Sequence, residues 1–419
     1  MDQTSSGVYK GMVGIYPIYD PVADPGDERF GLRLPGVPNI NTGRVDYDIP
    51  LVLYDCALDD GVTPHKDFHS GCGETHPEWW GKTFFKHFPN KGFVGDVFTV
   101  NGTAYPMLEV KRRKYRFRFL DASVSRIYEL KLMSSSSAPL AAPGIQGQYQ
   151  LPDGQQCMRF VEIATDGGLL PYPILRNTFE LWPAKRREVI VDFSKYQDGT
   201  PTTPGDVVYL VNTAQMLTGR MPNGPKMEGP NDTMVPDPIY DPNYRVPILK
   251  FVIGNTAPDN SLIPQTLRPL PPLPSNLNQL RRRTFEFSRE ELGGEIQWAI
   301  NGREFNPTVS LANVKRGVPE VWTLKNKGVG WVHPVHLHME EHRVLKRDGQ
   351  NIVAAPPALP KVAQGKDIDD ASREDVIALR PNEEVVFYRN FRTFYGRYVT
   401  HCHNLAHEDH AMMFGWTIV

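Results

Sequence analysis

Residues 110–120 read VKRRKYRFRFL, and from Tyr115 onward aromatic and basic side chains alternate. Successive side chains of a β-strand point to opposite faces of its sheet. Tyr115, Phe117 and Phe119 would therefore share one face, and the intervening arginines would share the other. The stretch predicts a strand with an apolar face packed on a core.

The rest of the chain favours the same class of structure. Residues 11–20, 187–193 and 383–388 are further short runs typical of strands, and 38 prolines and 35 glycines separate such runs. No long segment has the 3.6-residue period of an amphipathic helix. We predict an all-β protein whose domains each consist of two packed sheets, as a β-sandwich or barrel.

Two Asn-Gly pairs and one proline-rich stretch suggest how the chain is divided. Asn101-Gly102 and Asn301-Gly302 each follow an apolar run, which predicts two hairpin turns 200 residues apart in two related β-domains. The proline-rich stretch lacks periodicity and predicts a linker. The predicted parts are an N-terminal strand within residues 1–24, a middle domain at 40–255, the linker at 256–280 and a C-terminal domain at 281–419.

Composition excludes several classes of function. The net charge is −2, and no basic stretch is interleaved with aromatic residues, so nucleic acid is not an expected partner. The short basic runs at 111–114 and 281–283 are interpreted as solvated strand entrances. No apolar run approaches the roughly 18 residues that cross a bilayer, and residues 1–6 do not resemble a secretory signal. Cys56 and Cys72 either form a disulfide within one loop or stay unpaired.

The residues with the clearest chemistry lie near the end of the chain. Residues 398–413 read YVTHCHNLAHEDHAMM and combine one cysteine, four histidines and two methionines. Two imidazoles, one thiolate and a weak axial sulfur are the ligands preferred by copper that cycles between two oxidation states. A second run, WVHPVHLH at 331–338, adds three histidines. Together the two runs predict copper binding.

Strand alternation sorts these ligands into two sites. Cys402 would point to one face of its strand, and the histidines on either side of it to the other. The sites would then lie back to back, joined through the backbone on either side of Cys402. The candidate ligands of the first site are His333, Cys402, His407 and Met412. The candidate ligands of the second site are His336, His338, His401 and His403. His342 and His410 receive no role.

A weaker candidate lies in the predicted middle domain. His65, His69, His76 and His87 have spacings that are compatible with metal binding. They fall in a long loop, where histidines are common without a metal. A metal site there is the weaker expectation, and neither copper site depends on it.

Residues 330–338 and 401–413 resemble the multicopper oxidases, and among them bilirubin oxidase and bacterial spore-coat laccase most. Residues 45–53, 113–119 and 166–171 add support, so the resemblance extends over nearly the whole chain. It implies cupredoxin-like domains. It also implies an activity, the oxidation of phenolic, bilirubin-like or other small reducing substrates one electron at a time. Dioxygen would be the terminal acceptor, reduced to water at a trinuclear copper cluster.

The resemblance also implies roles for individual residues. His333, Cys402, His407 and Met412 match type 1 copper ligands, and His336 matches a type 2 ligand. His338, His401 and His403 match type 3 ligands. Glu408 matches an acid that helps protons to reach the trinuclear cluster; its position alone fits a solvated carboxylate equally well. Trp331 matches a tryptophan near the type 1 copper, where it packs, docks substrate or passes electrons.

The chain departs from the family pattern in its first part. Family members carry two further His-x-His pairs in a first domain, and residues 7–16 resemble the strand that follows the second pair. We therefore expect that most of this domain and half of the trinuclear ligands are missing. A missing N-terminal segment would also explain why residues 1–6 do not resemble a secretory signal, so we still suspect an extracytoplasmic or secreted location. Two alternatives to an oxidase follow: a type 1 electron-transfer or copper-handling protein, and one half of a two-chain oxidase. The unpaired N-terminal strand favours self-association or a partner chain.

Overall fold

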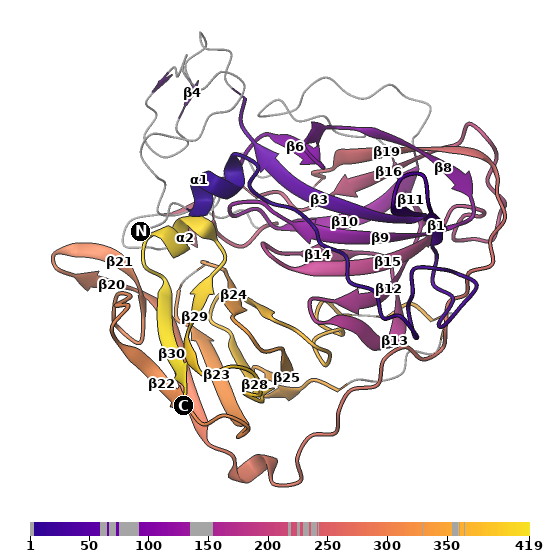
Figure 1. Cartoon of the computed structure of the whole chain (residues 1–419). Helices are drawn as coiled ribbons and strands as arrows, with labels where there is room; N and C mark the ends of the chain where they lie inside the picture. The colour runs from indigo at the N-terminus through magenta and orange to yellow at the C-terminus, as the bar shows by residue number, and fades with distance from the viewer. Residues whose placement is uncertain are drawn as a thin grey trace.

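The computed structural model describes residues 4–58, 65–66, 73–74, 92–134, 154–216, 219–223, 227–228, 234–235, 241, 243–328, 330–353, 359, 361–363 and 365–419. Within these residues nearly all regular structure is β, arranged as two bodies of paired sheets (Figure 1). The predicted all-β class is confirmed. None of the described helices is long and apolar enough to cross a membrane.

The first body, here called the middle body, contains a seven-stranded and a six-stranded sheet. The larger sheet has the order β13 (Gly168–Arg176), β12 (Phe160–Thr165), β15 (Arg186–Asp192), β9 (Lys114–Asp121), β3 (Asp48–Cys56), β6 (Val97–Val100) and β7 (Thr103–Ala104). The smaller has the order β11 (Gln156–Met158), β10 (Tyr128–Ser134), β16 (Val207–Asn212), β19 (Val246–Thr256) and β8 (Met107–Arg112), with β14 (Phe179–Leu181) also paired to β10.

The second body, the C-terminal body, contains a six-stranded and a five-stranded sheet. The first has the order β21 (Glu295–Ile300), β20 (Arg282–Leu292), β23 (Glu320–Asn326), β28 (Glu384–Arg389), β25 (His342–Arg347) and β26 (Gln350–Asn351). The second has the order β22 (Ser310–Val314), β30 (Met413–Ile418), β29 (Gly396–Cys402), β24 (His333–Leu337) and β27 (Val376–Leu379).

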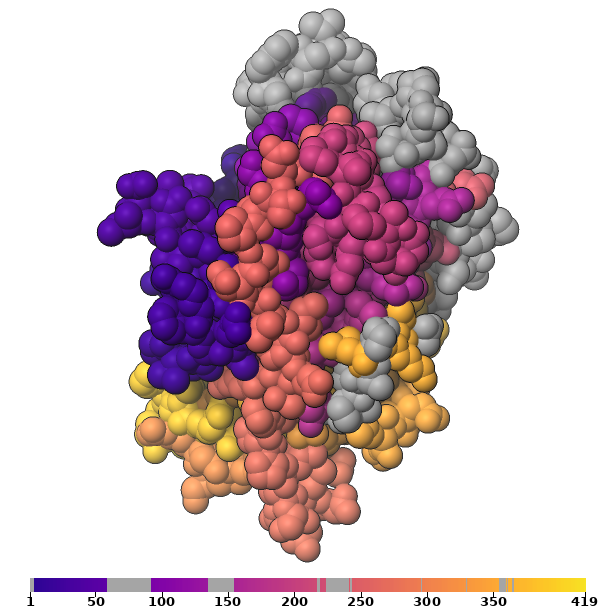
Figure 2. Space-filling model, turned by 90° about the vertical axis from the view of Figure 1, so that its right-hand side faces the viewer, coloured from indigo at the N-terminus to yellow at the C-terminus, as the bar shows by residue number. Residues whose placement is uncertain are grey.

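Short elements complete the described structure. The helices are α1 (Thr4–Tyr9), α2 (Leu405–Asp409) and the 3-10 helix η4 (Leu277–Gln279). The short strand pairs are β1 (Val37–Asn39) with β2 (Arg44–Asp46), β4 (His65–Lys66) with β5 (Gly73–Glu74), and β17 (Met227–Glu228) with β18 (Met234–Val235). Residues 257–276 form neither helix nor strand and run over the surface (Figure 2). We keep 256–280 as the proposed linker.

The stretch at 110–120 is two strands rather than one. It contributes to β8 and β9, which belong to different sheets, and the chain turns between them at Arg113. Tyr115, Phe117 and Phe119 lie in the core between the sheets, as the alternation predicts. Arg113, interpreted from sequence as solvated, is buried and ion-paired with Glu28. That interpretation was wrong because the N-terminal segment covers this part of the sheet.

The strand predicted at residues 11–20 is also absent. The chain there follows α1, and residues 12–19 pair with no strand in the described part of the molecule. Met12, Tyr16 and Ile18 are 79%, 89% and 78% exposed. An apolar sequence becomes a strand only where a neighbour accepts its backbone hydrogen bonds, and no described strand lies alongside.

Both predicted Asn-Gly turns are confirmed. Asn101 and Gly102 have φ of 51° and 81° and connect β6 to β7. Asn301 and Gly302 have φ of 54° and 66° and lie between the bridged residues at 300 and 303. Positive φ at both central positions is the type I′ geometry that fits the twist of a hairpin.

A buried ionic cluster joins the two bodies. Arg176 and Arg187 of the middle body each pair with two carboxylates, Glu162 of the same body and Asp369, which precedes β27. Arg176 lies 2.5 Å from an Asp369 oxygen, and Arg187 also contacts Asp369 directly. Burial opposes ionisation of Glu162, but the two arginines outweigh burial and lower its pKa. The cluster fixes the segment before β27 against the middle body.

Removing Asp369 tests this connection. Asp369→Ala leaves two buried arginines with one carboxylate, and we expect it to lower the free energy of unfolding by about 3 kcal/mol. Glu384→Ala is the control because it removes an exposed partner of Lys325, and such pairs contribute little. Urea unfolding followed by tryptophan fluorescence measures both variants. Equal midpoints for the two would contradict a stabilising role for the cluster.

Candidate metal centre

The two histidine runs meet through the pairing of β24 with β29. These strands are antiparallel, with Val335 opposite Cys402 and His336 opposite His401. Cys402 belongs to the core of the C-terminal body, and His336 and His401 lie on the other face of the sheet. Alternation along paired strands thus separates the ligands into two groups.

The first group converges on the Cys402 sulfur. The Sγ atom lies 3.5 Å from His333 Nδ1 and 3.6 Å from His407 Nδ1, and the two Nδ1 atoms are 3.3 Å apart. His407 comes from α2, which follows β29 directly. After α2 the chain turns back, and the N–H of Met412 donates to the carbonyl of His407. All four side chains are fully buried.

The protonation states of this group suit a metal ion. Burial lowers the pKa of His333 to about 3, so its imidazole is neutral. Burial raises the pKa of Cys402 well above the ordinary thiol value. Metal binding must therefore displace a thiol proton, as is usual for cysteine sites. Two imidazoles and one cysteine aimed at a common point, with Met412 buried in the same core, form a donor set that fits copper.

The second group comprises His336, His338 and His401, whose ligand atoms all lie within 4.8 Å of one another. The Nε2 atoms of His338 and His401 are 3.1 Å apart. His403 lies just past the end of β29, with its ring centre 5.4 Å from that of His401 and 6.2 Å from that of His336. His403 thus lies beside the group, but its ring nitrogens are not among the ligand atoms that lie within 4.8 Å of one another.

Glu408 contacts this second group. Its carboxylate lies 3.2 Å from His401 Nδ1, and its side chain is only 11% exposed. It follows His407 on α2, so one short helix reaches both groups. The start of α1 is held against α2 because Asp409 accepts hydrogen bonds from the backbone of Thr4 and Ser5. Glu408 is therefore a positioned carboxylate and not a solvated one.

Two tryptophans enclose the first group. The ring of Trp298, from β21, lies 3.8 Å from the ring of His407, and Trp331 packs edge-on against Trp298 at 5.2 Å. Arg220 of the middle body lies over Trp331 at 3.9 Å. Both tryptophans are buried. Trp331, which the sequence singles out, is thus a wall between the first group and the middle body.

The sequence did not reveal Trp298, Asp375 or Arg186. His336 Nδ1 lies 3.0 Å from the backbone carbonyl of Asp375, which leaves Nε2 to face the other histidines. Arg186 makes a bidentate ion pair with Asp375 at 2.7 and 2.6 Å. The two contacts join residues 39 and 189 positions apart in the chain, so no local pattern predicts them. The middle body thus holds a ligand of the C-terminal body in place.

The remaining histidines and the predicted cysteine bridge complete the account. His342 is buried outside both, against Phe387, and His410 lies next to the Ala406 carbonyl. Cys72, His69, His76 and His87 lie outside the described residues. His65 is seen only as backbone of β4. The predictions for the loop and for a Cys56–Cys72 bridge therefore stay predictions.

Comparisons with known proteins agree with this geometry. A family model described as multicopper oxidase matches residues 269–419. Bilirubin oxidase of Albifimbria verrucaria is 31% identical over 99% of this chain, which spans 58% of that protein's length. A laccase of Bacillus stratosphericus is 30% identical over 99% of this chain and 68% of its own length. The chain belongs to the multicopper oxidase family.

Solved structures of multicopper oxidases share this fold. McoA multicopper oxidase of Aquifex aeolicus superposes with a TM-score of 0.62 at 22% identity, covering 89% of this chain and 66% of that one. A laccase of Pediococcus acidilactici superposes with a TM-score of 0.60 at 23% identity, covering 93% and 62%. The cupredoxin-like architecture is confirmed, and copper is the cofactor of the family.

The ion pair of Arg186 with Asp375 makes a testable prediction about His336. Arg186→Gln should lower the affinity of the second group for Cu²⁺ about tenfold, because a partner that orients a metal ligand typically contributes that much. The affinity of the first group for Cu²⁺ should not change. Titration with Cu²⁺ followed by electron paramagnetic resonance separates the two sites. Arg186→Lys, which keeps the charge, should restore part of the affinity, and equal losses at both sites would contradict a specific role.

Proposed function

We propose that this chain contains the type 1 copper site of a laccase-like or bilirubin oxidase-like multicopper oxidase. The convergence of His333, His407 and Cys402 carries the proposal. With Met412 as axial ligand, these residues would hold one copper ion. That ion would accept single electrons from phenolic, bilirubin-like or other small reducing substrates. Trp298 and Trp331 exclude water from the site, which favours rapid electron transfer with little solvent rearrangement.

The second group would supply half of the ligands for a dioxygen-reducing cluster. His336 would take the type 2 role, and His338, His401 and His403 the type 3 role. The neighbouring Glu408 carboxylate supports this assignment, because reduction of dioxygen to water consumes protons. Glu408 is well placed to hold a proton beside His401. The remaining ligands would have to come from outside the described residues, either in this protein or in a partner chain.

The two sites share a covalent connection. His401, Cys402 and His403 are consecutive, so a path of bonds runs from the Cys402 sulfur through the backbone to ligands of the second group. When bound, copper supplies one-electron redox chemistry at the first site and dioxygen reduction at the second. The chain's part is to fix the ligands at both ends of this path, which the β24–β29 pairing achieves.

Copper counting with Cys402→Ser tests the proposal. Wild type loaded with Cu²⁺ should show an intense blue absorption, and Cys402→Ser should lose it because the thiolate is the source of the colour. Retention of the colour in Cys402→Ser would overturn the type 1 assignment. His338→Gln serves as the control and should keep the blue absorption while losing copper at the second site.

Oxygen uptake distinguishes an oxidase from the alternatives. About four copper ions per chain with uptake of dioxygen would support a complete enzyme. One blue copper without uptake would support an electron-transfer or copper-handling protein instead. Uptake that appears only after a partner chain is added would support the two-chain oxidase.

A further inference from the structure

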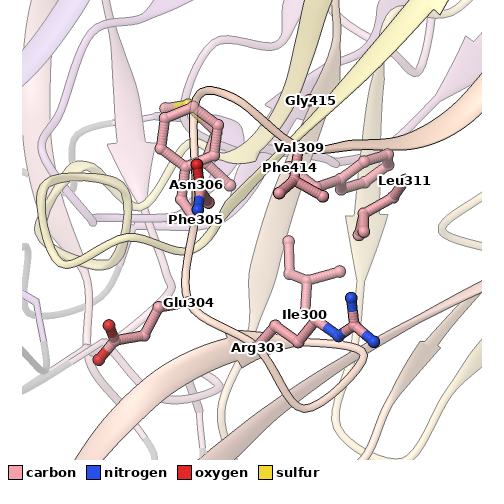
Figure 3. Close-up of a pocket in the computed structure, with 10 residues that line it drawn as sticks. Ile300, Arg303, Glu304, Phe305, Asn306, Val309, Leu311, Phe414 and Gly415 are labelled. Atoms are coloured by element: carbon pink, nitrogen blue, oxygen red, sulfur yellow. The ribbon is translucent and has the colours of Figure 1, made fainter.

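Charged side chains of the C-terminal body lie in two very different surroundings. A cavity of about 240 Å³ between the loop at 303–309 and the start of β30 is lined by Arg303 and Glu304 (Figure 3). Both residues are exposed, so water solvates their charges and neither requires a partner. Arg389 of β28 carries its charge inside the core of the same body, where water cannot do this.

Arg389 is enclosed by apolar rings and only partly hydrogen-bonded. Its exposed fraction is 0%, and the rings of Trp322, Phe391 and Trp416 lie around its guanidinium at 5.8, 5.4 and 4.8 Å. The Nη2 atom donates to the carbonyl of His338. The Nε and Nη1 atoms have no hydrogen-bond partner in the described part of the chain. Buried N–H groups without an acceptor are rare in proteins and indicate an ion or water that completes the site.

The carboxylates near Arg389 are engaged elsewhere. Glu340 is buried, and its oxygens accept hydrogen bonds from the side chain and the backbone of Arg392. Asp375 is paired with Arg186. Burial lowers the pKa of Arg389 to about 9, although Glu340 and Asp375 oppose this shift. The guanidinium is therefore charged at neutral pH and has no direct counter-charge among the described residues, which is strongly unfavourable inside a core.

His342 of β25 is the neighbour of Arg389 across the sheet. The two residues are paired directly in the antiparallel register of β25 with β28, and both are buried. The Cβ atoms of such a pair are roughly 5 Å apart. Burial lowers the pKa of His342 to about 3, so its ring is neutral and carries one N–H. Neither ring nitrogen has a partner in the described part of the chain. Two adjacent buried side chains thus present N–H donors that no described acceptor meets.

We propose that Arg389 and His342 form a binding site for a small monovalent anion such as chloride inside the C-terminal body. The anion would supply the counter-charge of the guanidinium and accept hydrogen bonds from both side chains. One unpaired positive charge requires a monovalent ion, and the close packing of a core favours a monatomic one. This inference does not rest on the proposed function, because it concerns neither of the two metal groups.

The proposed site adjoins the second metal group through one backbone carbonyl. Arg389 donates to the carbonyl of His338, and the Nε2 atom of His338 lies 3.1 Å from that of His401. An anion that holds the guanidinium in place would also hold this carbonyl. The anion would therefore stabilise the C-terminal body at the end of β24, where the strand delivers His338 to the second group.

Unfolding of the metal-free protein tests the site, because without copper the added anion cannot act as a copper ligand. Urea unfolding followed by tryptophan fluorescence is measured while sodium chloride replaces sodium gluconate at constant ionic strength. The folding equilibrium constant should rise about tenfold for each tenfold rise in chloride concentration once the site is mostly filled, since the anion binds only the folded chain. Gluconate is too large for a core site and should have no such effect.

Three variants locate the effect. Arg389→Met should abolish the chloride dependence, because it removes the charge and leaves an apolar side chain in the apolar enclosure. Arg389→Lys keeps the charge and should retain a weaker dependence. Arg397→Met is the matched control, since Arg397 is an exposed arginine of β29, and it should respond to chloride like wild type.

Crystals of wild type grown in sodium bromide give a second measurement that needs no variant. Anomalous diffraction should show a bromide ion in contact with the Arg389 guanidinium, and this result decides the matter if Arg389→Met does not fold. A water molecule at that position would overturn the proposal, as would equal unfolding midpoints of wild type in chloride and gluconate. A bromide peak without any chloride dependence would mean binding at crystal concentration only. A chloride dependence that Arg389→Met retains would place the anion elsewhere, and both results would also overturn the proposal.

Discussion

The register between β24 and β29 is the constraint on which both metal groups depend. Cys402, which is paired with Val335, points into the core. His401, which is paired with His336, points out of it. A slip of one residue would exchange the faces of every ligand on one strand. The register is held because the core face carries large apolar side chains, among them Leu337 and Phe414. Hydrophobic packing thus decides which histidines share a site with the cysteine.

Burial gives the two groups different characters. The first group lies wholly inside the C-terminal body, where burial keeps the pKa of His333 low and the pKa of Cys402 high. Its donors are therefore arranged before any metal arrives. The second group lies at the edge of that body, where the His336 side chain is 24% exposed and Asp375 is paired with Arg186 of the middle body. Docking of the two bodies contributes to both groups, because Ser125 of the middle body also donates a hydrogen bond to Asn404, whose side chain lies 3.1 Å from His407 Nε2.

Sequence patterns predicted the features that depend on neighbours along one strand. The alternation at 115–119 placed three rings in the core, and the His-Cys-His run separated two sets of ligands. The failures concern contacts between distant segments: Arg113 was predicted to be solvated because nothing local shows that Glu28 will cover it. Residues 11–20 were predicted as a strand because an apolar pattern does not reveal whether a partner strand exists. Trp298 was missed because it contacts His407 only after distant segments of the C-terminal body have folded together.

The loop at 303–309 shows how side chains near the start of β30 can vary without disturbing the candidate metal ligands. The loop at 303–309 starts from a hairpin turn fixed by positive φ at Asn301 and Gly302, and it ends where β22 pairs with β30. Its side chains can therefore change while both ends remain anchored. The start of β30 is fixed more tightly, because the strand begins at Met413, directly after the candidate axial ligand Met412. The candidate metal ligands are therefore constrained by the sheet, whereas the side chains of the loop are not, as is common where a rigid scaffold carries a variable loop.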